Sequence, residues 1–247
     1  MAGFAELSFA VPSELSRRLS AGELDVALVP VIELLRNRGW SVVSDACIAC
    51  RGPVWSVQTL FRTDPSRVRT LAVDEGSRTS AALTQILLYE RYGVLPEVRT
   101  LPLASSVLDC DADAALVIGD RAMHLSRLPE VFAARWDLGE EWFAATGLPF
   151  VFAAWIGREC FDDSVLGDLL QQHRDDGLDH AAELAAEHAP QHMLSAADVE
   201  RYFLQHLTFR LGQDERQGME MFLAKAAALG LDRSLVARPH SMESANR

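Results

Sequence analysis

Short apolar runs alternate with amphipathic segments through the first two thirds of the chain. Short runs closed by Gly, Pro or Asp are typical of buried strands, and segments with apolar residues three or four apart are typical of helices packed on one face. This pattern predicts strands at 24–29, 40–43, 55–61, 71–74, 114–118 and 150–156, with helices at 13–19, 32–38 and 79–92. Strands that alternate with helices predict an α/β fold with a mostly parallel sheet.

The pattern changes in the last third of the chain, which is helical throughout. It predicts helices at 163–173, 179–187, 195–209 and 214–229. Ser195 precedes Asp198 by three residues, an arrangement close to a capping box. These helices must pack back on the sheets that precede them.

Charge and composition restrict the ligands that the protein can bind. The 247 residues carry a formal net charge of −12, and phosphate binding needs clustered Lys and Arg, so no nucleic-acid partner is expected. An anionic ligand must instead be bound by local donors. No apolar run is long enough to span a membrane, and no leader-like N-terminus is visible.

The sequence offers little for a metal or cofactor. Cys47 and Cys50 form a lone C-x-x-C, which is compatible with a redox pair or half a zinc site. No second ligand pair follows at a suitable spacing, so we interpret them as buried thiols in a strand-like run. Glycine-rich nucleotide motifs are absent as well, and we expect neither a metal nor a cofactor.

The clearest chemical feature is the segment Ser77-Arg78-Thr79-Ser80, which lies between a strand with its glycine turn and a helix. Free N–H groups at a helix start, aided by hydroxyls, form an anion site. A carboxylate would fit there, and Arg78 could clamp it through two hydrogen bonds or turn outward in a structural role. An ordinary helix cap explains the same residues.

Three further segments can line a pocket. Thr146 and Gly147 form a turn before an aromatic strand, and Gly147 would let a ligand approach the backbone. Asp120 ends the strand at 114–118, where sites collect in α/β sheets. Ser56 follows a Gly-Pro turn, which places its hydroxyl beside a strand. Turn, cap and salt-bridge roles remain open for all of them.

Several segments taken together resemble a known family. They occur in a fixed order: 22–30, 48–56, 77–80, 116–120, 137–142 and 146–153. The series resembles chorismate dehydratase of the futalosine route to menaquinone, over residues 12–231 or so. Each segment is modest alone, and the ordered set is specific.

The resemblance implies a periplasmic-binding-protein-like type II fold, with two α/β lobes, a cleft and a helical C-terminal region. The first lobe is then expected from residues 1–69 with 155–247, and the second from 70–154. The chain would cross between them near Pro65 and Trp155. Residues 77–80 would face the N-terminal segment and Ser56 across the cleft.

The resemblance also implies an activity, the loss of water from chorismate to give 3-[(1-carboxyvinyl)oxy]benzoate. The expected substrate-binding residues are Ser77, Arg78, Thr79, Ser80, Ser56, Thr146 and Gly147. No residue is an obvious strong base, so we hypothesise that the side-chain carboxylate of the substrate takes the proton. A cytoplasmic monomer or homodimer with a small dicarboxylate substrate is expected.

The start of the chain departs from the family pattern. The family's first strand and a Tyr-Leu-Asn loop are not found, and the loop asparagine is expected to face the substrate, so the catalytic residue stays unassigned. We expect a misassigned start rather than a divergent chain. Two other functions remain open: the sister enzyme that makes 1,4-dihydroxy-6-naphthoate, and a non-catalytic protein that binds a small carboxylate.

Overall fold

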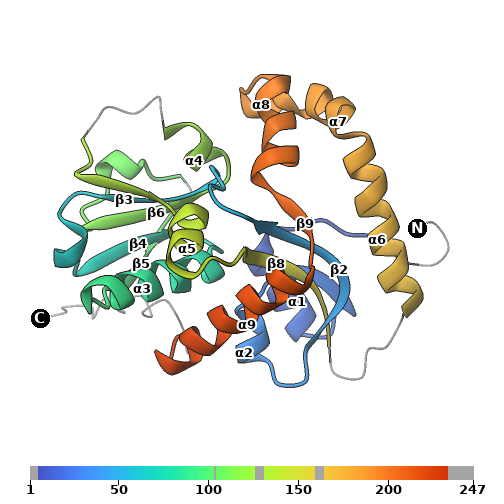
Figure 1. Ribbon diagram of the computed structural model, residues 1–247, viewed down its shortest axis with the longest axis horizontal. Helices are drawn as coiled ribbons and strands as arrows, with labels where there is room; N and C mark the ends of the chain where they lie inside the picture. Colours follow the sequence, from blue (N-terminus) through green and yellow to red (C-terminus); the bar gives the residue numbers. More distant parts are fainter. Residues whose placement is uncertain (1–4, 103, 126–130, 159–163, 233–247) are drawn as a thin grey trace, which may run out of the picture.

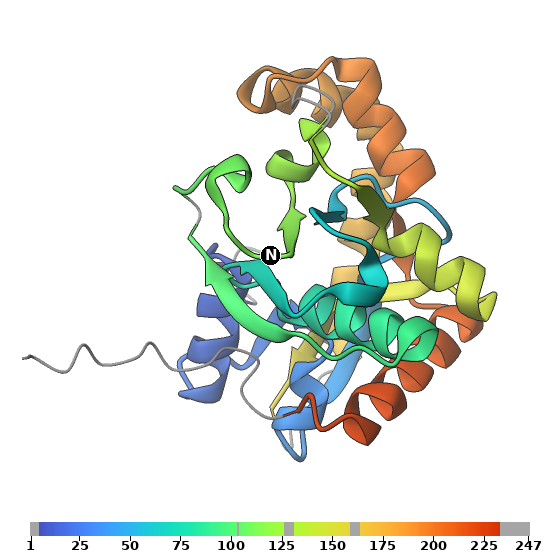
Figure 2. The same ribbon diagram turned by 90° about the vertical axis from the view of Figure 1, so that its left-hand side faces the viewer.

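The computed structural model describes residues 5–102, 104–125, 131–158 and 164–232. Two sheets lie side by side, each with its own helices (Figure 1). Helices α7 and α8 lie at one end of the molecule, and α9 lies at the other end (Figures 1 and 2).

The larger sheet has the strand order β5-β4-β6-β3-β7. Its strands are β3 (Val57–Phe61), β4 (Thr70–Asp74), β5 (Glu97–Leu101), β6 (Ala114–Ile118) and β7 (Ala134–Asp137). Strand β4 is parallel to β5 and β6, whereas β3 is antiparallel to β6 and β7. The carboxyl ends of β4 and β6 therefore share one edge with the amino end of β3.

The smaller sheet has the order β1-β8-β2-β9 and is antiparallel throughout. Its strands are β1 (Val26–Pro30), β2 (Ser41–Cys50), β8 (Phe150–Gly157) and β9 (Thr208–Arg210). The prediction of a mostly parallel sheet is wrong here. The chain leaves after β2 and returns as β8, which inserts between β1 and β2, and alternation along the sequence cannot show that reversal.

Helices cover both sheets. They are α1 (Pro12–Ser20), α2 (Glu33–Arg36), α3 (Arg78–Tyr92), α4 (Asp120–Met123), α5 (Leu138–Thr146), α6 (Ser164–Asp179), α7 (Ala181–His188), α8 (Ala196–Arg201) and α9 (Gln213–Ala228). Short 3-10 turns are η1 (Pro65–Arg67), η2 (Val107–Asp109) and η4 (Ala189–His192), and η5 (Tyr202–His206) is a π-helical turn. No helix in the described part of the chain is both long and apolar enough to cross a membrane.

The division between the two halves differs from the one expected. Strand β3 pairs with β6, and β8 pairs with β1 and β2. The chain therefore changes sheets after Cys50 and again before Phe150, rather than near Pro65 and Trp155. We call the smaller sheet with residues 5–50 and 150–232 the first lobe, and the larger sheet with residues 57–146 the second lobe.

Close helix packing fixes both crossings. Gly139 of α5 lies against the carbonyl of Gly52, and Gly218 of α9 lies against the carbonyl of Pro149. A Cβ atom at either glycine would overlap that backbone oxygen, so only glycine fits. Each crossing segment is therefore held against a neighbouring helix.

The main hydrophobic core is continuous across the crossings. Its buried residues come from both sheets. Trp142 of α5, Phe150 of β8 and Phe222 of α9 meet edge to face, with ring centroids 5.4 Å apart for Trp142–Phe150 and 5.1 Å for Phe150–Phe222. Such contacts stabilise beyond simple area burial, so the lobes are joined firmly on this side.

Most predicted elements are present, and Ser195 caps α8 as expected. The helix predicted at 195–209 instead ends at His206, and Thr208–Arg210 forms β9 on the edge of β2. Strands β5 and β7 were not predicted, because an edge strand exposed to solvent carries polar residues that weaken the apolar signal.

Candidate functional site

The start of α3 presents backbone donors at the junction of the lobes. Ser77 is its N-cap residue, but its hydroxyl donates back to the Asp74 carbonyl at 2.7 Å and does not cap the helix. Within the described residues, no side chain accepts a hydrogen bond from the N–H groups of Thr79 or Ser80. All three hydroxyl side chains are buried. This is the arrangement that favours a carboxylate.

Ser56 lies at the same edge of the larger sheet. Its carbonyl accepts from Gly119 N at 2.8 Å, just after β6. Asp74, at the end of β4, accepts from Ile118 N at 3.0 Å. Since β3, β6 and β4 are neighbours, two strand spacings separate Ser56 from the end of β4, roughly 10 Å. The fold thus places Ser56 at the same sheet edge as the end of β4, which leads into residues 77–80, rather than across the cleft from them as expected.

Asp74 holds the ends of β4 and β6 together. Its buried carboxylate pairs with Arg121 at 2.5 Å. Burial raises the pKa of Asp74, and the hydrogen bond from Ile118 N and the charge of Arg121 oppose that rise. With both oxygens engaged, Asp74 has a structural role at this edge.

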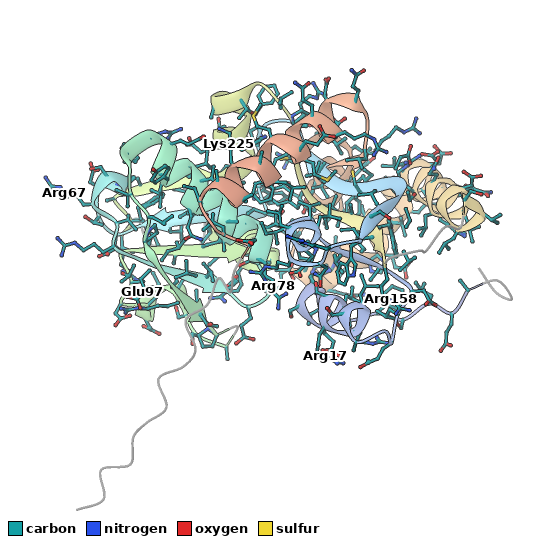
Figure 3. All side chains as sticks on the ribbon, turned by 90° about the horizontal axis from the view of Figure 1, so that it is seen from below. Arg17, Arg67, Arg78, Glu97, Arg158 and Lys225 are labelled. Carbon is teal, nitrogen blue, oxygen red and sulfur yellow. The ribbon has the colours of Figure 1, made fainter. Side chains whose placement is uncertain are left out.

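The first lobe covers the start of α3. Ile32 N donates to the Thr79 hydroxyl at 3.4 Å, and Arg78 pairs with the buried Glu33 at 2.7 Å. Figure 3 shows Arg78 where the two lobes meet. The Glu33 carboxylate also accepts a hydrogen bond from the Asn37 side-chain amide at 3.3 Å. Arg78 therefore contacts the opposite lobe, the structural role that the sequence left open.

Tyr202 completes this cluster and was missed in the sequence. Its hydroxyl, on η5, donates to the Ser56 hydroxyl at 2.8 Å from a residue 146 positions away. Burial raises the pKa of Tyr202, and the hydrogen bond to Ser56 opposes this. No local pattern distinguishes Tyr202 from any aromatic residue in a helix, so the sequence carried no signal for its role.

Thr146 and Gly147 lie at the C-terminal end of α5. The Thr146 hydroxyl donates to the Trp142 carbonyl at 2.8 Å and accepts from Leu148 N at 3.1 Å. Gly147 is the C-cap of α5 with a φ of 72°. Since a helix rises 1.5 Å per residue, both lie roughly 13 Å from the α5 start that contacts the crossing beside Ser56. The structure gives them a capping role.

Asp120 lies at the carboxyl end of β6, as the sequence predicted, and contacts the helical C-terminal region. It pairs with His192 Nδ1 at 2.8 Å, and His124 Nε2 is 2.8 Å from the His192 carbonyl. These two polar contacts join α4 to η4.

Two cavities lie outside this cluster. One of about 570 Å³ is lined by Trp55, Gln58, Arg135, Asp137 and His206 among others. The other, of about 380 Å³, lies near Arg99 and Cys110. Neither is lined by residues 77–80, because the first lobe lies against them.

The cysteines are as predicted. Cys47 and Cys50 are free, buried thiols in β2. Burial raises the pKa of Cys47 to about 12 and raises that of Cys50 well above its usual range. Among the residues that the structure describes, no group of three His, Cys, Asp or Glu side chains could hold a metal.

Comparison with solved structures defines the fold. The fold is that of the periplasmic binding proteins. The aliphatic sulphonate binding protein of Escherichia coli matches with a TM-score of 0.60 at 11% identity, covering 97% of this chain and 83% of that one. A Candida albicans protein described by the same generic fold gives 0.55 at 13%, covering 88% and 78%. A structure from Archaeoglobus fulgidus gives 0.70 at 18%, covering 92% and 87%.

Sequence comparison gives the family. A family model described as menaquinone biosynthesis matches residues 3–228. Chorismate dehydratase of Thermus thermophilus is 32% identical over 238 residues, which cover 90% of this chain and 86% of the relative. The chain belongs to this menaquinone biosynthesis family, which confirms the resemblance seen in the ordered segments.

Proposed function

We propose that the protein is a cytoplasmic chorismate dehydratase that forms 3-[(1-carboxyvinyl)oxy]benzoate in the futalosine route to menaquinone. The observation that carries the proposal is the start of α3, where no side chain of the described residues caps the helix and where Thr79 and Ser80 supply hydroxyls, at the same sheet edge as Ser56. Chorismate carries two carboxylates and a hydroxyl, so it needs separated clusters of donors. The 32% identical relative supports this choice of substrate.

One carboxylate of chorismate binds at the first turn of α3 in this proposal. The N–H groups of Thr79 and Ser80 and the hydroxyls of those residues donate to it. Ser56 donates to a second oxygen of the ligand. Arg78 pairs with Glu33 across the two lobes in the closed arrangement, while Thr146 and Gly147 act through the stability of α5.

Access to the site requires the lobes to separate. Ser56, Ser77, Thr79 and Ser80 are all buried, so the described arrangement is a closed one. The crossings at 51–56 and 147–149 serve as the hinge, and the polar contacts of His192 and Tyr202 part when the lobes open. Closure then removes water from the bound substrate.

The chemistry is the elimination of water. A C–H bond breaks at the ring carbon that bears the enolpyruvyl ether, and a C–O bond breaks at the neighbouring carbon. The proton and the hydroxide leave as water, and the ring becomes aromatic. Asp74, Glu33 and Asp120 are each paired with a basic side chain. We therefore assign the proton to the substrate's own side-chain carboxylate, while the protein orients and desolvates.

The test compares two buried threonines of α3. Thr79→Val removes a donor to a buried carboxylate and is expected to raise KM by roughly 10- to 100-fold. Thr84→Val is the matched control, because Thr84 bonds within the second lobe to Ser80 O and Thr59. It is expected to lower stability and leave KM unchanged.

Product is followed by the ultraviolet spectrum and by mass spectrometry. Dehydration by the wild type, with KM raised only in Thr79→Val, supports the proposal. Equal KM values in both variants would overturn the assignment of the α3 start. Folded wild-type protein that binds chorismate without product would instead indicate a carboxylate-binding protein, and formation of 1,4-dihydroxy-6-naphthoate from its precursor would indicate the sister enzyme.

A further inference from the structure

The backbone of Ser56 is held by hydrogen bonds through both its N–H and its carbonyl. Its N–H donates to the Val54 carbonyl at 2.7 Å, and its carbonyl accepts from Gly119 N. The residue before it, Trp55, has a φ of 64°, a conformation that costs free energy outside glycine. Neighbouring groups must therefore stabilise this strained turn, which positions Ser56.

Two groups from different lobes hold the turn. Asp137 of the second lobe accepts from Trp55 N at 2.7 Å. The Trp55 ring meets Tyr202 edge-on at a centroid distance of 6.0 Å and meets His206 at 5.9 Å. Both aromatic partners belong to η5 of the first lobe. The π-helical turn thus packs against the turn that carries Ser56, and π turns of this kind are frequent at functional sites.

The direction of the hydrogen bond between the Tyr202 and Ser56 hydroxyls decides whether Ser56 can donate to a ligand. Tyr202 donates to the Ser56 oxygen at 2.8 Å. A serine hydroxyl has one proton and two lone pairs, so accepting from Tyr202 leaves the Ser56 proton free to be donated. Without Tyr202, the Ser56 hydroxyl could rotate and donate elsewhere.

We infer that Tyr202 is a positioning residue, which directs the Ser56 hydroxyl as a donor to the bound substrate when the lobes close. The inference rests on the proposed function for the identity of the ligand. Tyr202 lies on the first lobe, and Ser56 lies in the crossing segment, where its carbonyl is bound to the second lobe through Gly119 N. In this proposal the pair therefore forms only in the closed arrangement. Substrate binding and assembly of the site are thereby coupled. A purely structural contact would instead affect stability alone.

A double-mutant cycle tests this inference. Tyr202→Phe removes only the hydroxyl and keeps the ring against Trp55. It is expected to lower kcat/KM for chorismate roughly 10-fold, and Ser56→Ala is expected to do the same. The double variant should be no slower than Ser56→Ala alone, because Tyr202 acts through Ser56. Tyr89→Phe, at an exposed tyrosine of α3, is the control and should match the wild type.

The outcomes separate the two proposals. Wild-type kcat/KM in Tyr202→Phe, or independent losses that multiply in the double variant, would overturn the role of Tyr202 and leave the proposed function intact. If the wild type shows no dehydration, the proposed function fails. The cycle is then measured on the Kd for chorismate. Zero coupling in that Kd overturns the inference, and coupling between the two hydroxyls supports it. A folded wild type that does not bind chorismate overturns both proposals.

Discussion

Helices α3 and α5 both begin at the junction of the lobes, and they differ in whether a side-chain carboxylate caps the helix start. The start of α5 holds a carboxylate of the protein itself. Asp137 accepts from Gly139 N at 3.0 Å and Glu140 N at 3.2 Å, and from Val54 N and Trp55 N of the crossing segment. The start of α3 has Ser77 at the same position, and its hydroxyl turns back to the Asp74 carbonyl.

The difference shows how a carboxylate fits this junction. At α5, backbone N–H groups surround a resident carboxylate, which fixes the crossing and caps the helix. At α3, equivalent N–H groups lack a side-chain acceptor in the described part of the chain. One helix start serves structure, and the other is available for a carboxylate ligand. Two predictions test this contrast, and a third concerns carboxylates elsewhere in the larger sheet.

The largest effect is expected from making α3 resemble α5. Ser77→Asp places a resident carboxylate at the helix N-cap, where it takes the donors and repels the charge of the substrate. We expect the affinity for chorismate, measured by calorimetry, to fall at least roughly 100-fold. Ser77→Asn adds an uncharged cap of similar size and should cost roughly 10-fold. Unchanged affinity in folded Ser77→Asp would show that the ligand binds elsewhere.

The next effect concerns the resident carboxylate. Asp137→Ala leaves the N–H groups of the crossing and of α5 without their acceptor, so the free energy of unfolding should fall by about 2 kcal/mol. Asp64→Ala is the control. Asp64 caps the exposed turn η1 through Ser66 N, and its loss should cost about 0.5 kcal/mol. Denaturant unfolding measures both, and equal losses would contradict the role given to Asp137.

The smallest effect is a pH dependence of stability with opposite signs at two carboxylates. Hydrogen bonds from Arg69 N and Thr70 N lower the pKa of Asp113 below its usual 3.8. Its contribution is therefore present above that value and is lost as the pH falls below it. Burial raises the pKa of Asp74 above 3.8. Its contribution is therefore present below 3.8 and is lost as the pH rises through its folded pKa.

Asn variants at the two positions check these signs. Relative to the wild type, Asp113→Asn should lose its stability deficit as the pH falls below about 4. Asp74→Asn should improve relative to the wild type as the pH rises above about 4. Unfolding curves across this range give both trends. Parallel curves for either variant and the wild type would show that the carboxylate titrates alike in the folded and unfolded chains.

Much of the local structure followed from the sequence. The strands at 71–74, 114–118 and 150–156 were predicted because each is a short buried run, and α3 because its start and its Gly93 stop are local signals. The same local signals led to the prediction that residues 77–80 bind a carboxylate, which stays a prediction. Edge strands were missed, since their polar residues carry no burial pattern. The ordered segments of the chain also pointed to the family, which comparison confirmed.

The sequence by itself therefore determined the buried strands, most of the helices, the α3 start and the family, because these depend on neighbouring residues and on motif order. Tertiary structure alone decided the strand directions, the positions of the crossings and the partners of the polar groups. Arg78 and Glu33 are 45 positions apart, and Tyr202 and Ser56 are 146 apart. Whether such residues meet depends on how the whole chain packs, and no local pattern of hydrophobic and polar residues encodes that.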